Sequence, residues 1–243
     1  MERDRRTHVA TFLVEDAIAM GANIELSDAA AHHAHVKRLA VQDHVRVTDG
    51  AGHIGSGTIA SLERGSATIE VNEVTIVARP PAIHLRAPMA DRDRMLWLAE
   101  KVAELGVASW QVVRFRRSAS VSPRGEGPAF LARVRARMVS ALEQSGGAWM
   151  PALLSDTTPG GLTLANDETG ILLDVAGAPL PSIVSLPSPD TPVLLLGPEG
   201  GLEPAEMAEL QEKGWRRGSL ADTTLRFETA GVAAVAVCRA LRR

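Results

Sequence analysis

The sequence has little cysteine, no long apolar run and a small net charge, and each of these absences excludes a class of protein. Cys238 is the single cysteine among 243 residues, so neither an intrachain disulfide framework nor a cysteine-based metal site can form. No stretch approaches the roughly 20 apolar residues that a membrane span needs, and the charged N-terminus lacks the apolar core of a signal peptide. A formal net charge of −3 gives no global sign of a polyanionic partner. We therefore expect a soluble cytoplasmic protein.

The composition is that of a globular chain with one local excess of positive charge. Hydrophobic residues make up 45% and charged residues 23%, which is enough for a packed core in one large domain or two modest ones. Between Gln111 and Met138, seven arginines stand against one acid, Glu126. An arginine-rich stretch is typical of nucleic-acid binding, but an exposed helix face with its adjoining loop explains the same pattern equally well.

The part of the chain before Arg79-Pro80-Pro81 is rich in short, alternating, β-branched stretches. HVRVTDGAG, GSGTIASLE and SATIEVNEVTIV are separated by glycine-containing turn signals, which predicts a small antiparallel sheet or barrel. We interpret GHIGSG (52–57) as a hairpin turn. Consecutive prolines end a ladder of strand hydrogen bonds. The boundary they mark divides the chain into domains at 1–79 and 82–243.

After this boundary, strands and helices alternate. Strands are predicted over 83–89, 110–115, 171–175 and 193–197, and helices over 91–105, 129–144, 204–213 and 229–241. The runs at 171–175 and 193–197 are wholly apolar, as in strands covered on both faces. The pattern predicts an α/β domain on a mostly parallel sheet.

The stretch LLLGPEGG, which ends at Gly201, sets a rigid turn at the carboxyl end of one of these buried strands. Open α/β sheets bind their ligands at that edge, and glycines let the backbone approach a ligand closely. No Lys-Ser/Thr pair follows the glycines, so a Walker A loop is excluded. A purely structural turn is the alternative.

A second group of residues, LRFETA (225–230), precedes a helix of small residues that is expected to open at Thr229. Arg226 places a permanent cation just before the helix N-terminus, where the helix dipole does not favour it. The guanidinium therefore needs an anion. Glu199 is one candidate, a ligand carboxylate or phosphate is another, and a plain structural ion pair is the alternative.

Six of the seven histidines lie in the first 53 residues, and three of them form HHAH at 32–35. No second ligand group accompanies this cluster, so a metal site is not favoured. His33, Lys37 and Arg38 are spaced so that one helix could present them on a single basic face to phosphates, although an ordinary exposed helix explains them too. The C-terminal part holds one histidine, His84, so a Ser-His-Asp triad is poorly supported.

These motifs together resemble the RsmE family of 16S ribosomal RNA uridine N3-methyltransferases, which belongs to the SPOUT class. GPEGG after an apolar strand and LRFETA opening a helix resemble the family's C-terminal motifs. HHAHVKRLAVQDHVRVTDGAG, EKVAELGV, Arg117-Ser118 and EQSGGAWMP match further segments in the same order. The sequence departs from the family at Ala221, where a glycine is usual, and at Thr223, where an arginine is usual.

The resemblance implies a trefoil-knotted SPOUT methyltransferase domain behind a small PUA-like β-barrel that binds RNA. It implies S-adenosylmethionine as cofactor, no metal, a homodimer, and 16S rRNA of the small ribosomal subunit as partner. By the same resemblance Arg226 would stabilise the reacting base, with Glu199 orienting it. RNA contacts would come from His33, Lys37, Arg38, Arg117 and Gln144. The cofactor would be held by Leu172, Leu173, Leu196, Gly197, Pro198, Gly200, Gly201, Leu220, Thr224 and Leu225.

Two other functions stay open at this point. One is a SPOUT methyltransferase with another RNA target or base atom. The other is a non-catalytic RNA-binding or ribosome-assembly protein that keeps the fold.

Overall fold

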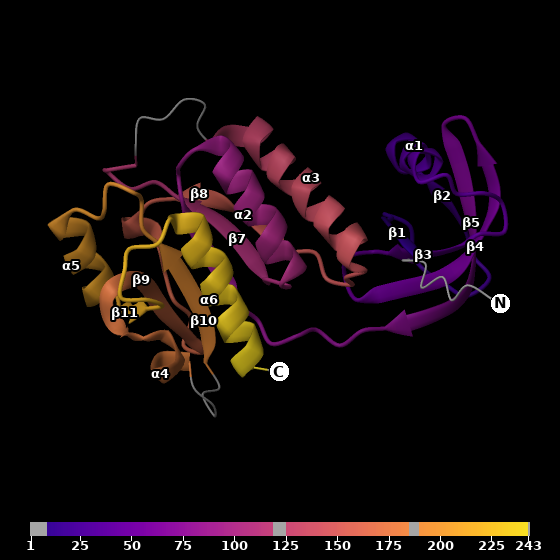
Figure 1. The fold of residues 1–243 in the computed structure, drawn as a ribbon. Coiled ribbons are helices and arrows are strands. Elements are labelled where there is room, and N and C mark those ends of the chain that lie inside the picture. Colours follow the sequence, from indigo (N-terminus) through magenta and orange to yellow (C-terminus); the bar gives the residue numbers. More distant parts are fainter. Residues whose placement is uncertain (1–8, 119–124, 185–189, 243) are drawn as a thin grey trace, which may run out of the picture. The chain divides into compact units, whose positions relative to one another are not determined.

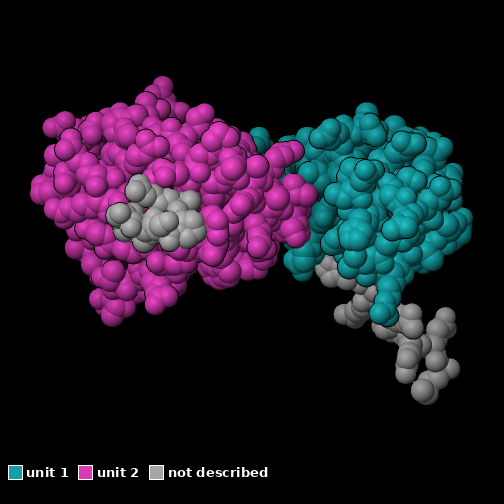
Figure 2. All heavy atoms as spheres, turned by 90° about the horizontal axis from the view of Figure 1, so that it is seen from above, with its two compact units in different colours: residues 1–79, 142–150 teal, residues 80–141, 151–243 magenta. Residues whose placement is uncertain are grey.

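The computed structural model describes residues 9–118, 125–184 and 190–242, which form two compact units. Unit 1 comprises residues 1–79 and Leu142–Met150, and unit 2 comprises residues 80–141 and 151–243. Figure 2 shows unit 1 in teal and unit 2 in magenta. The division assigns 142–150 to the N-terminal unit, which the sequence did not indicate.

Unit 1 is a five-stranded sheet with one short helix (Figure 1). Its elements are β1 (Ala10–Leu13), β2 (Asn23–Leu26), α1 (Asp28–Val36), β3 (His44–Thr48), β4 (His53–Glu63) and β5 (Ser66–Ile76). The sheet order is β1-β3-β4-β5-β2, and its pairs are antiparallel except for the parallel pair of β1 with β3. Buried residues such as Phe12, Val47 and Ile69 form its core. The predicted small sheet is present, with one parallel pair that was not expected.

The prediction that GHIGSG is a turn is wrong, because five of its six residues lie inside β4. The hairpin turn comes earlier, at 49–52, between β3 and β4. The ladder between β4 and β5 shifts register at Ser56/Gly57. A Cβ at Gly57 would collide with the backbone oxygen of Glu70. The glycine therefore permits a close approach of two strands at a bulge, which sequence alone does not distinguish from a turn.

The predicted basic helix face around His33 is also corrected. Ser27 caps α1, and the helix ends at Val36 with Lys37 as its C-cap. Arg38 has φ +57°, so it lies beyond the helix in left-handed backbone. His33, Lys37 and Arg38 are all exposed, but they do not share one helical face.

The segment 142–150 joins unit 1 through contacts around Trp149. The indole nitrogen of Trp149 donates to the backbone oxygen of Val77 at 3.0 Å, and the Arg79 guanidinium lies 5.2 Å from the ring centroid. Gly52 has φ +110°, and a Cβ there would meet the Trp149 ring at 2.5 Å. Trp149 of the EQSGGAWMP segment is therefore accounted for by packing in unit 1.

Unit 2 is a six-stranded sheet with helices on both faces. Its elements are β6 (His84–Pro88), α2 (Arg92–Glu104), β7 (Ser109–Val113), α3 (Gly127–Ser145, continuing into unit 1), β8 (Ala152–Thr157), the 3₁₀ turn η1 (Pro159–Gly161), β9 (Glu168–Pro179), α4 (Leu180–Val184), β10 (Thr191–Leu196), α5 (Pro204–Glu212), β11 (Arg216–Ser219) and α6 (Phe227–Leu241). The order is β11-β9-β10-β6-β7-β8, and all five pairs are parallel. This is the predicted parallel α/β arrangement.

The two faces of this sheet are covered by different helices. Alternate strand residues such as Leu172 and Leu195 pack with Leu210 of α5 and with Trp215. On the other face α2 and α6 lie side by side (Figure 1). A Cβ at Gly231 of α6 would meet Leu98 of α2 at 2.8 Å and Leu196 of β10 at 3.0 Å. The small residue at this position therefore lets α6 pack tightly against both.

The cysteine of α6 yields a first prediction. Cys238 is fully buried, and burial raises the pKa of its thiol to about 11. Since the thiolate is the reactive form, we expect no labelling by a thiol reagent in the folded protein at about pH 8 and prompt labelling after denaturation. Rapid labelling of the native protein would contradict this packing of α6.

Candidate functional site

One pocket of about 430 Å³ lies where three segments of unit 2 meet. The segments are the middle of β9, the turn after β10 and the chain from the end of β11 into α6. The lining residues are Leu173, Asp174, Val175, Leu196, Gly197, Pro198, Glu199, Gly201, Leu202, Met207, Gly218, Leu220, Ala221, Thr223, Thr224, Leu225, Arg226, Phe227 and Ala230. These are the same three segments that the sequence singled out, and the structure brings them together.

The strands explain why the segments converge. β9 and β10 run parallel, with Leu173 opposite Leu196, so the turn at 197–201 begins beside residues 173–175. β11 pairs with β9 on its other side. Because carboxyl ends of parallel strands share one edge of the sheet, the loops that follow them border one crevice.

Eight of the ten residues predicted to hold a cofactor line this pocket, and two do not. Leu172 points to the opposite face, where it packs in the core with Leu210 and Trp215. Gly200 belongs to the 197–201 turn but faces the loop that carries Arg117, because a Cβ there would meet the backbone oxygen of Arg117 at 3.0 Å. Ala221 and Thr223, the two departures from the family pattern, both line the pocket.

Arg226 lines the pocket, and among the described residues its positive charge has no carboxylate partner. Helix α6 begins at Phe227, two residues before the predicted start, and Arg226 is its N-cap residue without a side-chain capping bond. The side chain is exposed. Across 9–118, 125–184 and 190–242, no carboxylate pairs with its guanidinium. The guanidinium is therefore available to an anionic ligand.

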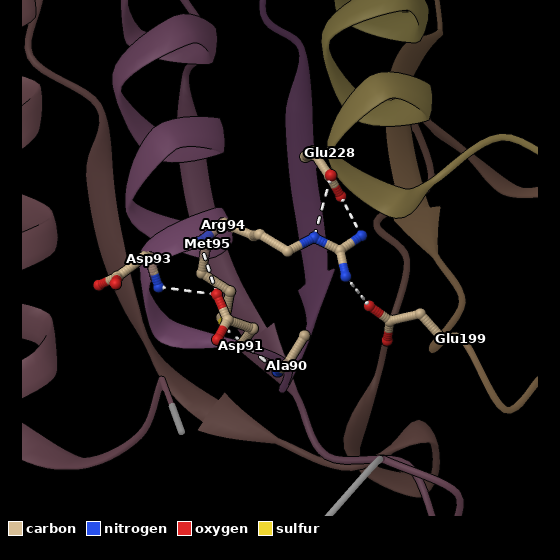
Figure 3. A network of polar contacts seen from close by, with 7 residues as sticks. All are labelled: Ala90, Asp91, Asp93, Arg94, Met95, Glu199 and Glu228. Atoms are coloured by element: carbon tan, nitrogen blue, oxygen red, sulfur yellow. Dashed lines mark hydrogen bonds and ion pairs between the residues drawn. The ribbon is translucent and has the colours of Figure 1, made fainter. Parts of the chain in front are cut away.

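Glu199, one of the candidate partners of Arg226, pairs with a different arginine. Glu199 instead accepts a hydrogen bond from Nη1 of Arg94 at 2.6 Å. Arg94 also donates from Nε and Nη2 to the two carboxylate oxygens of Glu228, at 3.0 and 2.6 Å (Figure 3). The hydrogen bond with Glu228 raises the pKa of the Arg94 guanidinium above its usual value. Arg94 thus makes the contact with Glu199 that the sequence interpretation considered for Arg226.

A second ion pair fixes an acid at the pocket wall. Asp174 accepts hydrogen bonds from Nε of Arg217 at 3.0 Å and from the backbone N–H of Ala176 at 2.9 Å. Nη2 of Arg217 pairs with the same carboxylate at 2.9 Å. These contacts, chiefly the one with Arg217, hold the pKa of the Asp174 carboxyl below its usual value. The carboxylate stays ionised and oriented at the pocket.

The loop after β7, which carries Arg117, is held against the glycine turn by a buried carboxylate. Glu206 of α5 is 6% exposed and accepts from the backbone N–H groups of Arg116 and Glu203, at 2.8 and 2.9 Å. Arg117 itself is exposed, with Nε 4.0 Å from Glu203. The other residues predicted to meet RNA are exposed and lie in unit 1: His33, Lys37, Arg38 and Gln144.

Two charged residues that shape this site, Arg94 beside the pocket and Asp174 in its wall, were not among the predicted site residues. A signal for Arg94 was present, because Asp91 caps α2 and Arg94 stands in its first turn, where the dipole disfavours a cation. The same reasoning selected Arg226. Asp174 gave no comparable signal, since its partner Arg217 lies 43 residues away.

None of the described helices combines the length and apolar character that crossing a membrane requires.

Comparisons with known proteins agree with this architecture. The RNA methyltransferase domain matches residues 78–239, more than half of the chain, and the RNA methyltransferase PUA domain matches residues 26–72. A ribosomal RNA small subunit methyltransferase E from Mycobacterium bovis is 26% identical over 223 residues, covering 84% of this chain and 80% of its own. The protein of the same name from Synechocystis is 28% identical over 229 residues, covering 90% and 74%.

A solved structure gives the same result. The ribosomal RNA small subunit methyltransferase E of Neisseria gonorrhoeae, bound to S-adenosyl methionine, superimposes with a TM-score of 0.86 at 26% identity, covering 96% of this chain and 98% of its own. The predicted resemblance and the α/β fold behind a PUA-like domain are thereby confirmed, while the threading of the knot stays a prediction. The chain belongs to the RNA methyltransferase family, in the RsmE group whose motifs its sequence carries.

Proposed function

We propose that the protein transfers a methyl group from S-adenosylmethionine to N3 of a uridine in 16S rRNA of the small ribosomal subunit. The observation that carries the proposal is the convergence of residues 173–175, 197–202 and 220–227 on one pocket at the carboxyl edge of the parallel sheet. The relatives named above supply the RNA class, since they bear the name of a small-subunit rRNA methyltransferase.

The residues of the pocket fit this cofactor. A volume of about 430 Å³ falls within the range of small-molecule sites. The lining combines aliphatic side chains, suited to an adenine ring, with glycine turns that leave backbone N–H and C=O groups accessible. The oriented Asp174 carboxylate can accept a hydrogen bond from a hydroxyl or an ammonium group. We assign cofactor binding to these loops, with Leu173, Leu196, Gly197, Leu220 and Leu225 among the contacts.

The chain's own contribution to catalysis follows from Arg226. Bound S-adenosylmethionine supplies an electrophilic methyl group on a sulfonium. Attack by uracil N3 requires loss of the N3 proton and a base edge free of pairing and stacking. Arg226 lines the pocket and no carboxylate of the described chain neutralises it, so its guanidinium can stabilise the negative charge that develops on the base. We assign Glu199 to holding the turn through Arg94 rather than to orienting Arg226.

We assign RNA contacts to exposed residues in both units. His33, Lys37, Arg38 and Gln144 in unit 1, and Arg117 beside the glycine turn, can bind phosphates or bases. In this proposal residues 1–79 are the RNA-binding domain and residues 82–243 the knotted methyltransferase domain. We further propose a cytoplasmic homodimer, as the RsmE resemblance implies.

Two measurements test the proposal and separate it from its rivals. Calorimetry with S-adenosylmethionine should give saturable binding, whereas a purely structural RNA-binding protein should give no heat. Nucleoside analysis of 16S rRNA from a deletion strain should show loss of one N3-methyluridine, restored by the gene in trans. Cofactor binding with N3-methyluridine unchanged in the deletion strain would point to another RNA or base atom.

A further inference from the structure

Arg94 joins three segments that are far apart in the sequence. It stands in the first turn of α2, its carboxylate partner Glu228 stands in the first turn of α6, and Glu199 stands in the turn after β10. Figure 3 shows its guanidinium between the two acids. Arg94 is not itself among the residues that line the pocket. Its two partner segments are two of the three that form the pocket.

The contact with Glu228 is the anchored half of this network. Both carboxylate oxygens of Glu228 accept from the guanidinium, and the Glu228 side chain is only 12% exposed. The guanidinium also lies over the Phe227 ring, 4.8 Å from its centroid. Bidentate geometry fixes direction as well as distance. The start of α6, and with it the neighbouring Arg226, is therefore held against α2.

The contact with Glu199 is the exposed half. The Nη1–Oε1 distance is 2.6 Å, with 31% of the Arg94 side chain and 39% of the Glu199 side chain accessible. Exposed ion pairs contribute little to global stability. Among the residues that the structure describes, however, Arg94 is the one side chain that forms a hydrogen bond or an ion pair with the Glu199 carboxylate. Loss of this contact would release the 197–201 turn while leaving the fold in place.

We propose that Arg94 is a positioning residue that fixes the 197–201 turn relative to the start of α6 and so keeps the cofactor pocket in its binding shape. Arg94 acts through Glu199 and Glu228 and needs no contact with the cofactor or the reacting base. This inference rests on the proposed function, because it assigns S-adenosylmethionine to the pocket. Its specific consequence is that cofactor affinity depends on a side chain outside the pocket wall.

The test compares Arg94→Gln and Arg94→Lys with Arg92→Gln as a matched control. Arg92 belongs to the same helix, and its Nε pairs with the carboxylate of its neighbour Asp93 at 3.2 Å. A remote mutation that misplaces a group by about 1 Å can lower a reaction rate by about a hundredfold. We expect Arg94→Gln to raise the calorimetric Kd for S-adenosylmethionine roughly tenfold. Lysine lacks the bidentate fork, so Arg94→Lys should restore only part of the affinity. Arg92→Gln should bind as the wild type does.

Glu199→Gln makes the test independent of the folding of Arg94→Gln, and the double variant tests whether the two side chains act together. Since the Arg94–Glu228 pair stays intact, Glu199→Gln should weaken cofactor binding without lowering the thermal unfolding temperature. The double variant Arg94→Gln/Glu199→Gln should bind no more weakly than Arg94→Gln alone, because the two groups act through one contact. In turnover assays the KM for cofactor should rise while the KM for RNA stays unchanged.

The possible outcomes separate the two proposals. Wild-type affinity in Arg94→Gln would overturn the positioning role while leaving the proposed function standing. If Arg94→Gln does not fold, Glu199→Gln decides, and wild-type affinity there overturns the role as well. Absence of S-adenosylmethionine binding by the wild-type protein itself would instead overturn the proposed function, and this inference with it.

Discussion

Replacing Arg226 by alanine is expected to lower kcat by about a hundredfold to a thousandfold, the cost of removing one preorganised group that stabilises transition-state charge. Arg226 is the N-cap residue of α6, exposed, and without a carboxylate partner in the described chain. Its removal therefore breaks no ion pair among the residues that the structure describes. We expect an unchanged unfolding temperature and an S-adenosylmethionine Kd close to that of the wild type. Steady-state methylation of 16S rRNA measures kcat, calorimetry on the same preparation measures the Kd, and thermal unfolding measures the stability.

Two companion variants make this result specific. Arg226→Lys keeps the charge but not the planar fork of donors, so it should recover part of kcat. Arg92→Ala removes an arginine of α2 that lies outside the pocket lining and should leave kcat unchanged. Turnover by Arg226→Ala near the wild-type rate would remove Arg226 from the mechanism and shift attention to other polar groups at the pocket.

The elements that sequence reasoning identified are those with strong local patterns. β9 and β10 were predicted from their apolar runs, and α2 and α3 from the helical spacing of their apolar residues. Each of these patterns is local and needs no information about distant parts of the chain. β8 was missed because this edge strand, ALLSDT, has no fully buried residue and no clear alternation. β9 is longer than predicted because its second half leaves the core, and its pairing with β11 resumes after a register shift. Tertiary pairing, not local propensity, defines both.

The sequence predicted which backbone segments form the site, but it did not predict which charged side chains pair there. The glycine turn and the chain before α6 carry recognisable motifs, and both border the pocket. Arg94 and Glu228 are 134 residues apart in the chain, and both flank helix N-termini, so the sequence did not show which arginine pairs with which acid. Glu199 was therefore one of several candidate anions for Arg226. Only the packing of α2 beside α6 reveals Arg94 as the partner.

Gly200→Val is expected to weaken S-adenosylmethionine binding by about tenfold to a hundredfold, since overpacking costs roughly 1–3 kcal/mol. Gly200 does not line the pocket, but a Cβ there would meet the backbone oxygen of Arg117 at 3.0 Å and its Cβ at 3.2 Å. The loop that carries Arg117 is held by Glu206, so it resists moving aside. The strain therefore falls on the 197–201 turn, which forms one wall of the pocket.

Gly160→Val provides the matched control, because the nearest obstacle is at the same distance but of a different kind. A Cβ at Gly160 would meet Oε1 of Glu209 at 3.0 Å, the end of a flexible side chain that can rotate away. Gly160 lies in η1, outside the pocket lining, so cofactor affinity should stay unchanged. Calorimetry gives the S-adenosylmethionine Kd of both variants and so compares obstruction by a backbone atom with obstruction by the end of a side chain. Equal cofactor affinity in the two would mean that the close approach of the turn to the Arg117 loop does not shape the pocket, and that the glycine serves the backbone of the turn alone.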